Sequence, residues 1–292
     1  MKAYVFPGQG SQFAGMGLDD NTLSGIAAEV YKKADEILGF GLSEVMFNGT
    51  EEDLQETRIT QPAIFLHSYA RVKMLGAGFR PDALAGHSLG EFTALTAAQA
   101  LSFENALLLV KERAEAMQAS CEEQEGTMAA VVGLDDEVVE KICAGITEVV
   151  VPANYNSPGQ LVISGSVEGI QKAIEQLTAA GAKKVIPLVV GGAFHSPLMQ
   201  SARERLSKAI RAIEFRSPVC AIYQNVTASP STDPEVIKQN LIDQLTAPVR
   251  WTQTMQNMIR DRITQFVEVG GKGRILCGLL RRINREVEAD WI

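Results

Sequence analysis

Apolar residues in the first part of the chain recur with two different periods. Short continuous apolar runs, typical of buried strands, stand at 4–6 and 83–85. Elsewhere apolar positions recur every three or four residues, which is the spacing of one helix face. This period predicts helices over 25–38, 63–75 and 89–101, and another that Ser102 caps at its N-terminus. Strands that alternate with helices favour a parallel sheet.

Between residues 126 and 190 the pattern changes to closely spaced short strands. The chain predicts a strand at 127–134, a helix at 135–146, strands at 149–154 and 161–165 around a Pro-Gly turn, a helix at 167–180 and a strand at 183–190. This β-α-β-β-α-β order is that of a ferredoxin-like unit. We therefore expect a small ferredoxin-like domain at 126–190.

The alternation of helix and strand returns after residue 190. Ser196 and Pro197 mark the start of a helix that reaches Ile213, since proline suits the first helical turn. The remaining elements are predicted as a strand at 219–225, a loop at 228–234 and a final strand at 266–269. We expect an α/β fold in which residues 1–125 and 191–292 form a large α/β-hydrolase-like domain with a parallel sheet, into which the small domain is inserted.

One serine lies between a predicted strand and a predicted helix, in Gly86-His87-Ser88-Leu89-Gly90. A serine at such a turn projects its hydroxyl outward, the glycines relieve crowding, and the helix start offers N–H groups to a developing anion. The pentapeptide alone also fits an ordinary turn whose glycines serve backbone geometry. The strand before it and the helix after it favour a nucleophile for acyl transfer.

A serine nucleophile needs a base, and the chain has three histidines. His67 lies in a periodic apolar stretch and is expected to be structural, and the side chain of His87 is expected to diverge from that of its neighbour Ser88. His195 follows the small residues 191–193 and comes after the serine in chain order, as in α/β hydrolases. We favour His195 as the base. Its orienting partner stays open between a carboxylate and a backbone carbonyl.

Composition and charge exclude several other functions. The 292 residues are 46% hydrophobic and 21% charged, which suits a folded enzyme. A net charge of −8 argues against nucleic acid or an anionic membrane as a partner. The four cysteines show no spacing suited to zinc and are expected to be free thiols. No run resembles a signal peptide or a membrane span, so we expect a cytoplasmic protein.

Several segments of the chain stand out when they are taken together and in order. They are Phe6-Pro7-Gly8-Gln9-Gly10-Ser11-Gln12, Thr60-Gln61-Pro62-Ala63, Gly86-His87-Ser88-Leu89-Gly90-Glu91, Asn154-Tyr155-Asn156-Ser157-Pro158-Gly159-Gln160, Gly192-Ala193-Phe194-His195-Ser196, Asn225-Val226-Thr227 and Pro248-Val249-Arg250-Trp251. In this order they resemble the malonyl-CoA:acyl carrier protein transacylases, a family that includes bacterial fatty-acid enzymes and polyketide acyltransferase domains. Several motifs in the family's order are more specific than any single one.

The resemblance implies roles for individual residues of the reaction centre. Ser88 would be the acylated nucleophile and His195 its base. The backbone N–H groups of Gln9 and Leu89 would form the oxyanion hole. The main-chain carbonyl of Gln244 would orient the histidine.

Two further residues would bind the substrate. Arg113 matches the family's arginine for the free malonyl carboxylate, which a planar guanidinium can hold with two hydrogen bonds. Without the family motif, Arg113 would be assigned to a solvated helix surface. Gln61 would line the pocket, and Ala193-Phe194 resembles the malonyl-selective form of the motif.

The resemblance implies transfer of malonyl from malonyl-CoA to the phosphopantetheine thiol of acyl carrier protein, which acts in trans. The reaction would be ping-pong, need neither metal nor redox cofactor, and supply fatty-acid synthesis. A thioester hydrolase, a trans-acting polyketide acyltransferase and an inactive carrier-binding module are the alternatives.

Two surface features bear on the carrier protein and on the family pattern. An acidic carrier would be steered by positive charge, for which we nominate Lys183, Lys184, Lys272, Arg274, Arg281 and Arg282. The segment Gly270-Gly271-Lys272-Gly273-Arg274 departs from the family's Gly-Pro-Gly-Lys and leaves the geometry of that loop open.

Overall fold

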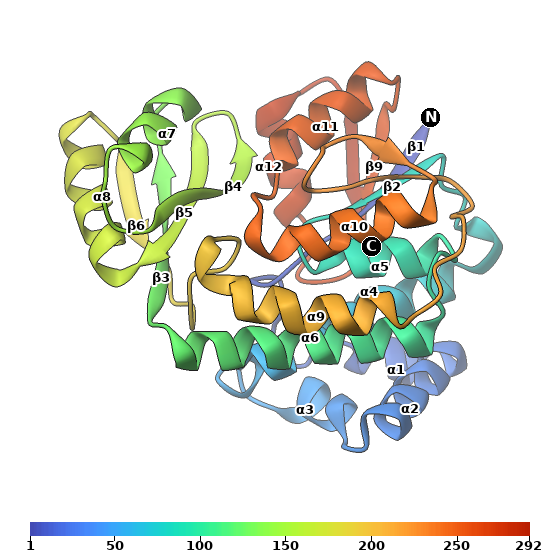
Figure 1. Cartoon of the computed structure of the whole chain (residues 1–292). Coiled ribbons are helices and arrows are strands. Elements are labelled where there is room, and N and C mark those ends of the chain that lie inside the picture. The colour runs from blue at the N-terminus through green and yellow to red at the C-terminus, as the bar shows by residue number, and fades with distance from the viewer.

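The chain folds around two β-sheets that lie side by side (Figure 1). The computed structural model describes the backbone of residues 1–292 and the side chains of all of them except Leu23. The larger sheet has the order β10-β9-β1-β2-β7-β8. Its strands are β1 (Lys2–Phe6), β2 (Ala83–Gly86), β7 (Ala221–Tyr223), β8 (Pro230–Ser231), β9 (Gln265–Glu268) and β10 (Glu288–Trp291). All are parallel except the edge strand β8, which pairs antiparallel with β7.

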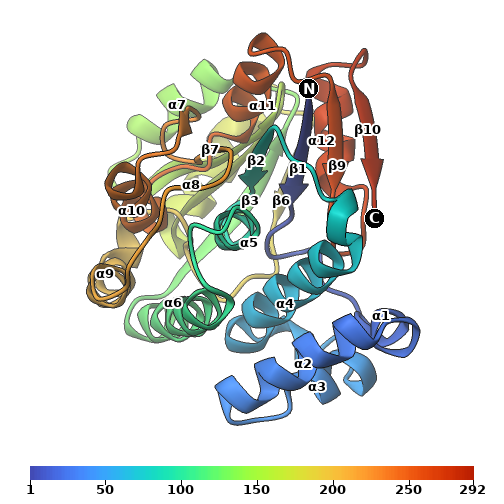
Figure 2. The same ribbon diagram turned by 90° about the vertical axis from the view of Figure 1, so that its right-hand side faces the viewer.

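Helices cover both faces of the larger sheet (Figure 2). The alternation along β1 separates the faces, because successive side chains of a strand point to opposite sides. Ala3 and Val5 pack with α11 (Trp251–Arg260) and α12 (Ile275–Ile283). Tyr4 and Phe6 face the larger core, which is built with α2 (Gly25–Leu38), α4 (Thr57–Leu75), α5 (Gly90–Ala97), α6 (Phe103–Glu123), α9 (Gln200–Arg211) and α10 (Pro234–Asp243). The helices α1 (Leu18–Leu23) and α3 (Leu42–Asn48) lie outside α4 (Figure 2).

The smaller sheet is antiparallel and has the order β4-β5-β3-β6. Its elements run β3 (Gly126–Val132), α7 (Asp136–Ala144), β4 (Val150–Ser157), β5 (Gln160–Ser166), α8 (Val167–Ala179) and β6 (Lys184–Pro187). The predicted β-α-β-β-α-β order is confirmed. A separate core, which includes Val131, Ile163 and Leu177, lies between this sheet and its helices.

Backbone hydrogen bonds of Val249 join the smaller sheet to the segment before α11. Val249, just before α11, donates its N–H to Ala153 O at 2.8 Å and accepts at its carbonyl from Tyr155 N at 2.9 Å. Asn154 of β4 is the residue that pairs with Val249 as an isolated parallel bridge. The Thr252 hydroxyl adds a bond to Tyr155 O at 3.0 Å. Strand β4 is therefore tied to the segment that leads into α11.

Several predicted boundaries are wrong. Helix α4 begins at Thr57 and contains Pro62, whereas its predicted start was after the proline. Thr60 and Gln61 are fully buried, so packing keeps this turn helical although Pro62 has no N–H to donate. Helix α5 stops at Ala97, short of the predicted 101, and the chain turns through a positive φ of 62° at Gln99. The predicted helix after Ser196 starts with a short 3-10 turn, and α9 begins at Gln200.

The strand at 266–269 is not the last one. Strand β10 follows it and pairs in parallel with β9 at the sheet edge. Its residues Glu288–Trp291 are mostly exposed, so the sequence has no apolar run there that would predict a strand. The predicted loop at 228–234 likewise contains the two-residue strand β8. Among the described residues, no helix combines the length and apolar composition needed to cross a bilayer.

Candidate active site

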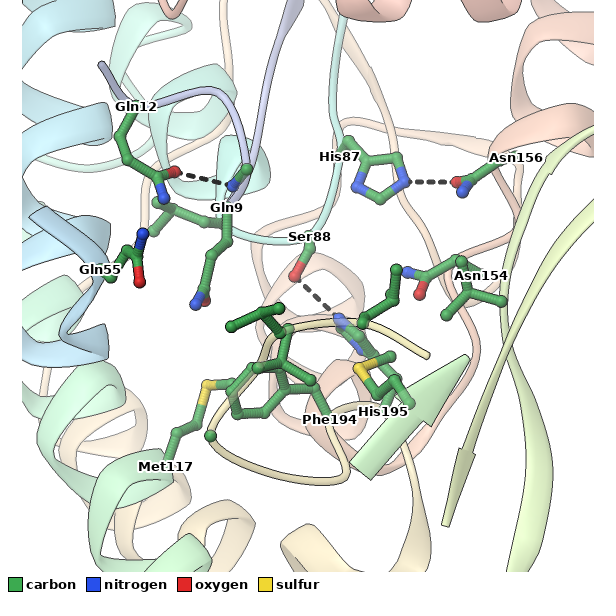
Figure 3. A pocket seen from close by; sticks show the side chains of 18 of the residues that line it. Gln9, Gln12, Gln55, His87, Ser88, Met117, Asn154, Asn156, Phe194 and His195 are labelled. Atoms are coloured by element: carbon green, nitrogen blue, oxygen red, sulfur yellow. Dashed lines mark hydrogen bonds between the residues drawn. The ribbon is translucent and has the colours of Figure 1, made fainter. Parts of the chain in front are cut away.

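Ser88 occupies a tight turn between β2 and α5. Its φ is 52°, a left-handed value that few residues other than glycine adopt. The flanking glycines allow the turn to pack. A Cβ on Gly86 would lie 1.9 Å from the Gly90 carbonyl carbon, and one on Gly90 would lie 2.1 Å from Phe6 O in β1. Strand, turn and helix thus meet at a distance that only glycine permits, and the serine hydroxyl points into the cavity (Figure 3).

His195 lies across from Ser88 although 107 residues separate them in the chain. The Ser88 Oγ to His195 Nε2 distance is 2.8 Å (Figure 3). His195 Nδ1 lies 2.9 Å from the main-chain oxygen of Gln244. Because a carbonyl only accepts, Nδ1 carries the proton and Nε2 is free to accept from the serine hydroxyl. The sequence leaves the orienting partner of His195 open between a carboxylate and a backbone carbonyl, and in the structure it is the backbone carbonyl.

The surroundings keep His195 neutral. Burial first, and then the charge of Arg113, lowers its pKa to about 3. An imidazole with this pKa is unprotonated at neutral pH and can take a proton from Ser88. Like the serine, His195 has a positive φ, 58°.

The two proposed oxyanion donors border the same cavity. Gln9 follows β1 and Leu89 follows Ser88, and both line the cavity wall. Among the described residues, the N–H groups of Gln9 and Leu89 donate none of the backbone hydrogen bonds found in turns, loops and caps. The Ser88 N–H, in contrast, is occupied by Asn225 Oδ1 at 2.7 Å.

Arg113 is buried, not solvated, and reaches the serine from α6. Only 1% of its surface is exposed. Its Nη2 donates to Ser88 Oγ at 3.0 Å and to Gln244 Oε1 at 3.2 Å, and its Nη1 donates to Gln61 Oε1 at 2.7 Å. Burial lowers the pKa of Arg113 to about 10, so the guanidinium stays charged at neutral pH. Gln61 is fully buried, and its contact with Arg113 places it beside the serine and arginine as the resemblance implies.

The cavity around Ser88 has a volume of about 700 Å³. Its wall combines amide side chains with apolar ones. The amides are Gln9, Gln12, Gln55, Asn154 and Asn156, and the apolar side chains are Leu89, Met117, Met128, Val162, Leu188, Val189, Val190 and Phe194. Several of them come from the smaller sheet, whereas Gln9 and Ser88 lie on the turns that follow β1 and β2 of the larger one (Figure 3).

The other two histidines lie elsewhere. His67 is fully buried, accepts from Gly271 N at 3.0 Å and lies 3.2 Å from Asp20 Oδ2, which is the structural role expected of it. His87 turns away from Ser88, and its Nε2 lies 2.9 Å from Asn156 Oδ1 (Figure 3).

The loop that departs from the family's Gly-Pro-Gly-Lys pattern has positive φ values at Gly270, Gly271, Gly273 and Arg274. It packs against the turn after β1, where Lys272 N donates to Ser11 O at 2.9 Å.

The exposed cations nominated for a carrier contact fall into two groups. One group is Lys184, the first residue of β6, with Lys183 just before it. The other is on the loop before α12 and on α12 itself and consists of Lys272, Arg274, Arg281 and Arg282. The roles of Glu91 and Asn225 are not evident from the sequence, although both belong to the quoted motifs. No group of three or more potential metal ligands occurs among the described residues.

A strand-turn-helix serine paired with a histidine, in an α/β fold, defines the class of enzymes that move acyl groups through serine. The model of the acyl transferase domain matches residues 3–277. A malonyl CoA-acyl carrier protein transacylase of Bacillus subtilis is 41% identical over 290 residues, which cover 98% of this chain and 91% of the relative. The chain belongs to the malonyl-CoA:acyl carrier protein transacylase family.

Solved structures agree with this membership. An acyl carrier protein S-malonyltransferase from Vibrio cholerae is 38% identical, with a TM-score of 0.96 and coverage of 100% of this chain and 96% of that one. A malonyl-transacylase in complex with a type II PKS acyl-carrier protein is 37% identical, with a TM-score of 0.96 and coverage of 100% and 95%.

Proposed function

We propose that this protein transfers a malonyl group from malonyl-CoA to the phosphopantetheine thiol of acyl carrier protein, through a malonyl ester on Ser88. One observation carries the choice of acyl group. The buried guanidinium of Arg113 lies 3.0 Å from the serine hydroxyl, where it can hold a carboxylate attached to the acyl chain. Family membership and the named activity of the relatives support the same reaction.

In the first half-reaction His195 Nε2 takes the proton of Ser88 Oγ as the oxygen attacks the thioester carbonyl. The Gln9 and Leu89 N–H groups stabilise the oxyanion. The C–S bond then breaks, the proton passes from His195 to the CoA thiolate, and malonyl stays on the serine. The Gln244 carbonyl keeps the imidazole in the required tautomer throughout.

The second half-reaction reverses these roles. The carrier thiol enters the cavity vacated by CoA, gives its proton to His195 and attacks the malonyl ester, which releases Ser88. One thioester replaces another, so the exchange is chemically balanced and involves no redox step. The amide side chains of the cavity wall offer partners to the amides of the phosphopantetheine arm.

The pathway and the place in the cell belong to the same proposal. We assign the product to fatty-acid synthesis in the cytoplasm, because the motifs resemble the fatty-acid enzymes at least as well as the polyketide ones. A trans-acting polyketide acyltransferase is the second candidate, since a malonyl-transacylase in complex with a type II PKS acyl-carrier protein is equally similar in structure. Genomic neighbours distinguish the two.

We also propose that residues 126–190 form a small domain inserted into a large one made of 1–125 and 191–292. The separate core between the smaller sheet and its helices supports this division. Cavity residues from both parts would then place the reaction between the domains.

The test is intact-mass measurement after incubation with malonyl-CoA. We expect a malonyl adduct that is absent from Ser88→Ala and that disappears when phosphopantetheinylated carrier protein is added, with malonyl gained by the carrier. Adduct loss to water without transfer would instead identify a thioester hydrolase. The absence of any adduct would favour a binding module.

A further inference from the structure

Glu91 is a fully buried carboxylate beside the reaction centre. It is the second residue of α5, three positions after Ser88. Its Oε1 accepts from Gln224 Nε2 at 2.7 Å, and its Oε2 accepts from Gln244 Nε2 at 2.8 Å and from Asn225 N at 3.1 Å. Such an anion in the interior requires an explanation, because burial of a charge is costly unless its partners compensate.

Two of these partners directly position the reacting groups. Gln244 offers its main-chain oxygen to His195 and its Oε1 to Arg113, and its Nε2 also lies 3.0 Å from Ser88 O. Asn225 accepts from Ser88 N through Oδ1 and donates Nδ2 to Gly86 O at 2.6 Å. These contacts hold the serine in its left-handed conformation and the histidine in its orientation.

The chemistry of the contacts fixes what Glu91 must be. All three partners donate N–H groups, so an acceptor-only carboxylate fits and a carboxylic O–H would face donors. Burial raises the pKa of Glu91, while the three donors and the Arg113 charge oppose the rise. Arg113, whose accepting partners Gln61, Ser88 and Gln244 are neutral, gains a compensating negative charge from Glu91.

We propose that Glu91 is a positioning residue: its buried carboxylate fixes Gln244 and Asn225, and through them His195, Arg113 and Ser88, in the geometry that acyl transfer requires. The inference rests on the proposed function for its consequence in catalysis. Its physical content is the alignment of Ser88 with His195, which can be measured without malonyl-CoA.

Glu91→Gln tests the role, because an amide keeps the shape but places an N–H₂ group against N–H donors. The matched control is Glu268→Gln. Glu268 is also fully buried, but it accepts from Ile275 N and Cys277 N at the start of α12 and contacts none of the reacting residues. The probe is a fluorophosphonate, which labels Ser88 and reports the reactivity of the Ser88–His195 pair directly.

For Glu91→Gln we expect labelling and malonyl transfer to fall together by about 10²-fold, since a small misplacement of reacting groups has that effect. Glu268→Gln should keep both rates even if the two variants lose similar thermal stability. The low-field proton NMR signal of His195 Nδ1–H should shift in Glu91→Gln only. If Glu91→Gln does not fold, Gln224→Met replaces it. This change removes one donor to Glu91 without touching Ser88, His195 or Arg113, and should lower labelling to an intermediate rate.

Labelling of Glu91→Gln within about twofold of the unmodified protein, or an equal loss in Glu268→Gln, would overturn the role of Glu91. An unmodified protein that is labelled but transfers no malonyl would contradict the proposed function alone. The comparison of labelling rates would then still decide the inference.

Discussion

Arg113 combines three properties that rarely occur together: it is buried, it is charged, and its acceptors are neutral. A guanidinium in this state gains from any anion that can reach it, since charge-assisted hydrogen bonds are stronger than neutral ones. The Ser88 hydroxyl accepts from one of its donors. A malonyl carboxylate would replace a neutral partner with a charged one.

Arg113→Ala should therefore change acyl selectivity. Loss of hydrogen bonds to a charged group costs about 1.5–3 kcal/mol, so kcat/KM for malonyl-CoA should fall by about 10- to 150-fold. Activity with acetyl-CoA, which has no carboxylate, should not fall in parallel. The control is Lys111→Ala on the same helix. Steady-state kinetics with both thioesters measure the ratio, and an unaltered malonyl preference would refute the role of Arg113.

His195 should make the stability of the protein depend on pH. Its pKa is about 3 in the folded protein against 6.5 for the free side chain, so between these values only the unfolded state takes up the proton. Its contribution to stability is complete above pH 6.5 and is lost as pH falls below it, with a slope of about 1.4 kcal/mol per pH unit.

Urea unfolding at pH 7, 6 and 5 should show this slope as a difference between the unmodified protein and His195→Asn. The comparison removes the parallel effects of His67 and His87, whose pKa values burial also lowers. Identical pH dependence in the two proteins would show that His195 titrates normally.

The positions of the site residues were predictable where the signal is local in the chain. The glycines around Ser88 and the small residues before His195 predict tight backbone turns. In the structure Ser88 Oγ and His195 Nε2 lie 2.8 Å apart. Arg113 and Gln244 carry no local signal, because what defines them is burial and contact with distant segments. Their assignment needed the family motif, and even that left Glu91 without a role.

Among the elements, those that meet at the Ser88 turn are packed too closely for side chains on the flanking glycines. Strand β1, strand β2 and helix α5 approach so closely that Gly90 leaves no room for a side chain. Gly278, inside α12, provides a contrast, because a methyl group added to it would meet no atom within 4 Å beyond its chain neighbours and the nearby backbone of its own helix.

Gly90→Ala should lower the free energy of unfolding by about 1–3 kcal/mol, as overpacking does. Gly278→Ala should raise it by about 0.5–1 kcal/mol, because glycine inside a helix is less favourable than alanine. Urea denaturation measures both changes. Equal effects of the two substitutions would mean that the turn can relax around a methyl group.

Amphipathic elements were predicted well, and exposed or short ones were not. Helix α2 has the predicted bounds, Gly25–Leu38, because one face of it is regularly buried. Strand β10 and the two-residue β8 were not predicted, because an edge strand buries little apolar surface and needs no apolar run in the sequence. Pro62 misled the prediction for α4, since tertiary packing kept helical a turn that local preference would end.

At the scale of the whole molecule, charge is unevenly distributed. The chain carries a net charge of −8, yet Lys272, Arg274, Arg281, Arg282 and Arg285 gather along the loop before α12, α12 itself and the residues just after it. Arg282 also contacts Gln160 of the smaller sheet. An acidic carrier protein would be attracted to this region.

Arg282→Glu should raise KM for the carrier protein and leave KM for malonyl-CoA unchanged. Lys32→Glu on α2 changes the net charge equally at a distant surface and is the control. Varying each substrate in turn measures the two constants. Equal carrier KM values for Arg282→Glu and Lys32→Glu would show that only total charge matters.

The bonds between β4 and Val249 limit how the molecule could be rebuilt. Replacing residues 126–190 by the corresponding segment of a relative would remove the β4 partner from two backbone hydrogen bonds of Val249, while Val249 itself would remain. Backbone groups do not depend on side-chain identity, so a donor segment with the same β4 register could remake them. Chimeras should therefore be chosen by strand register opposite Val249 before sequence identity is considered.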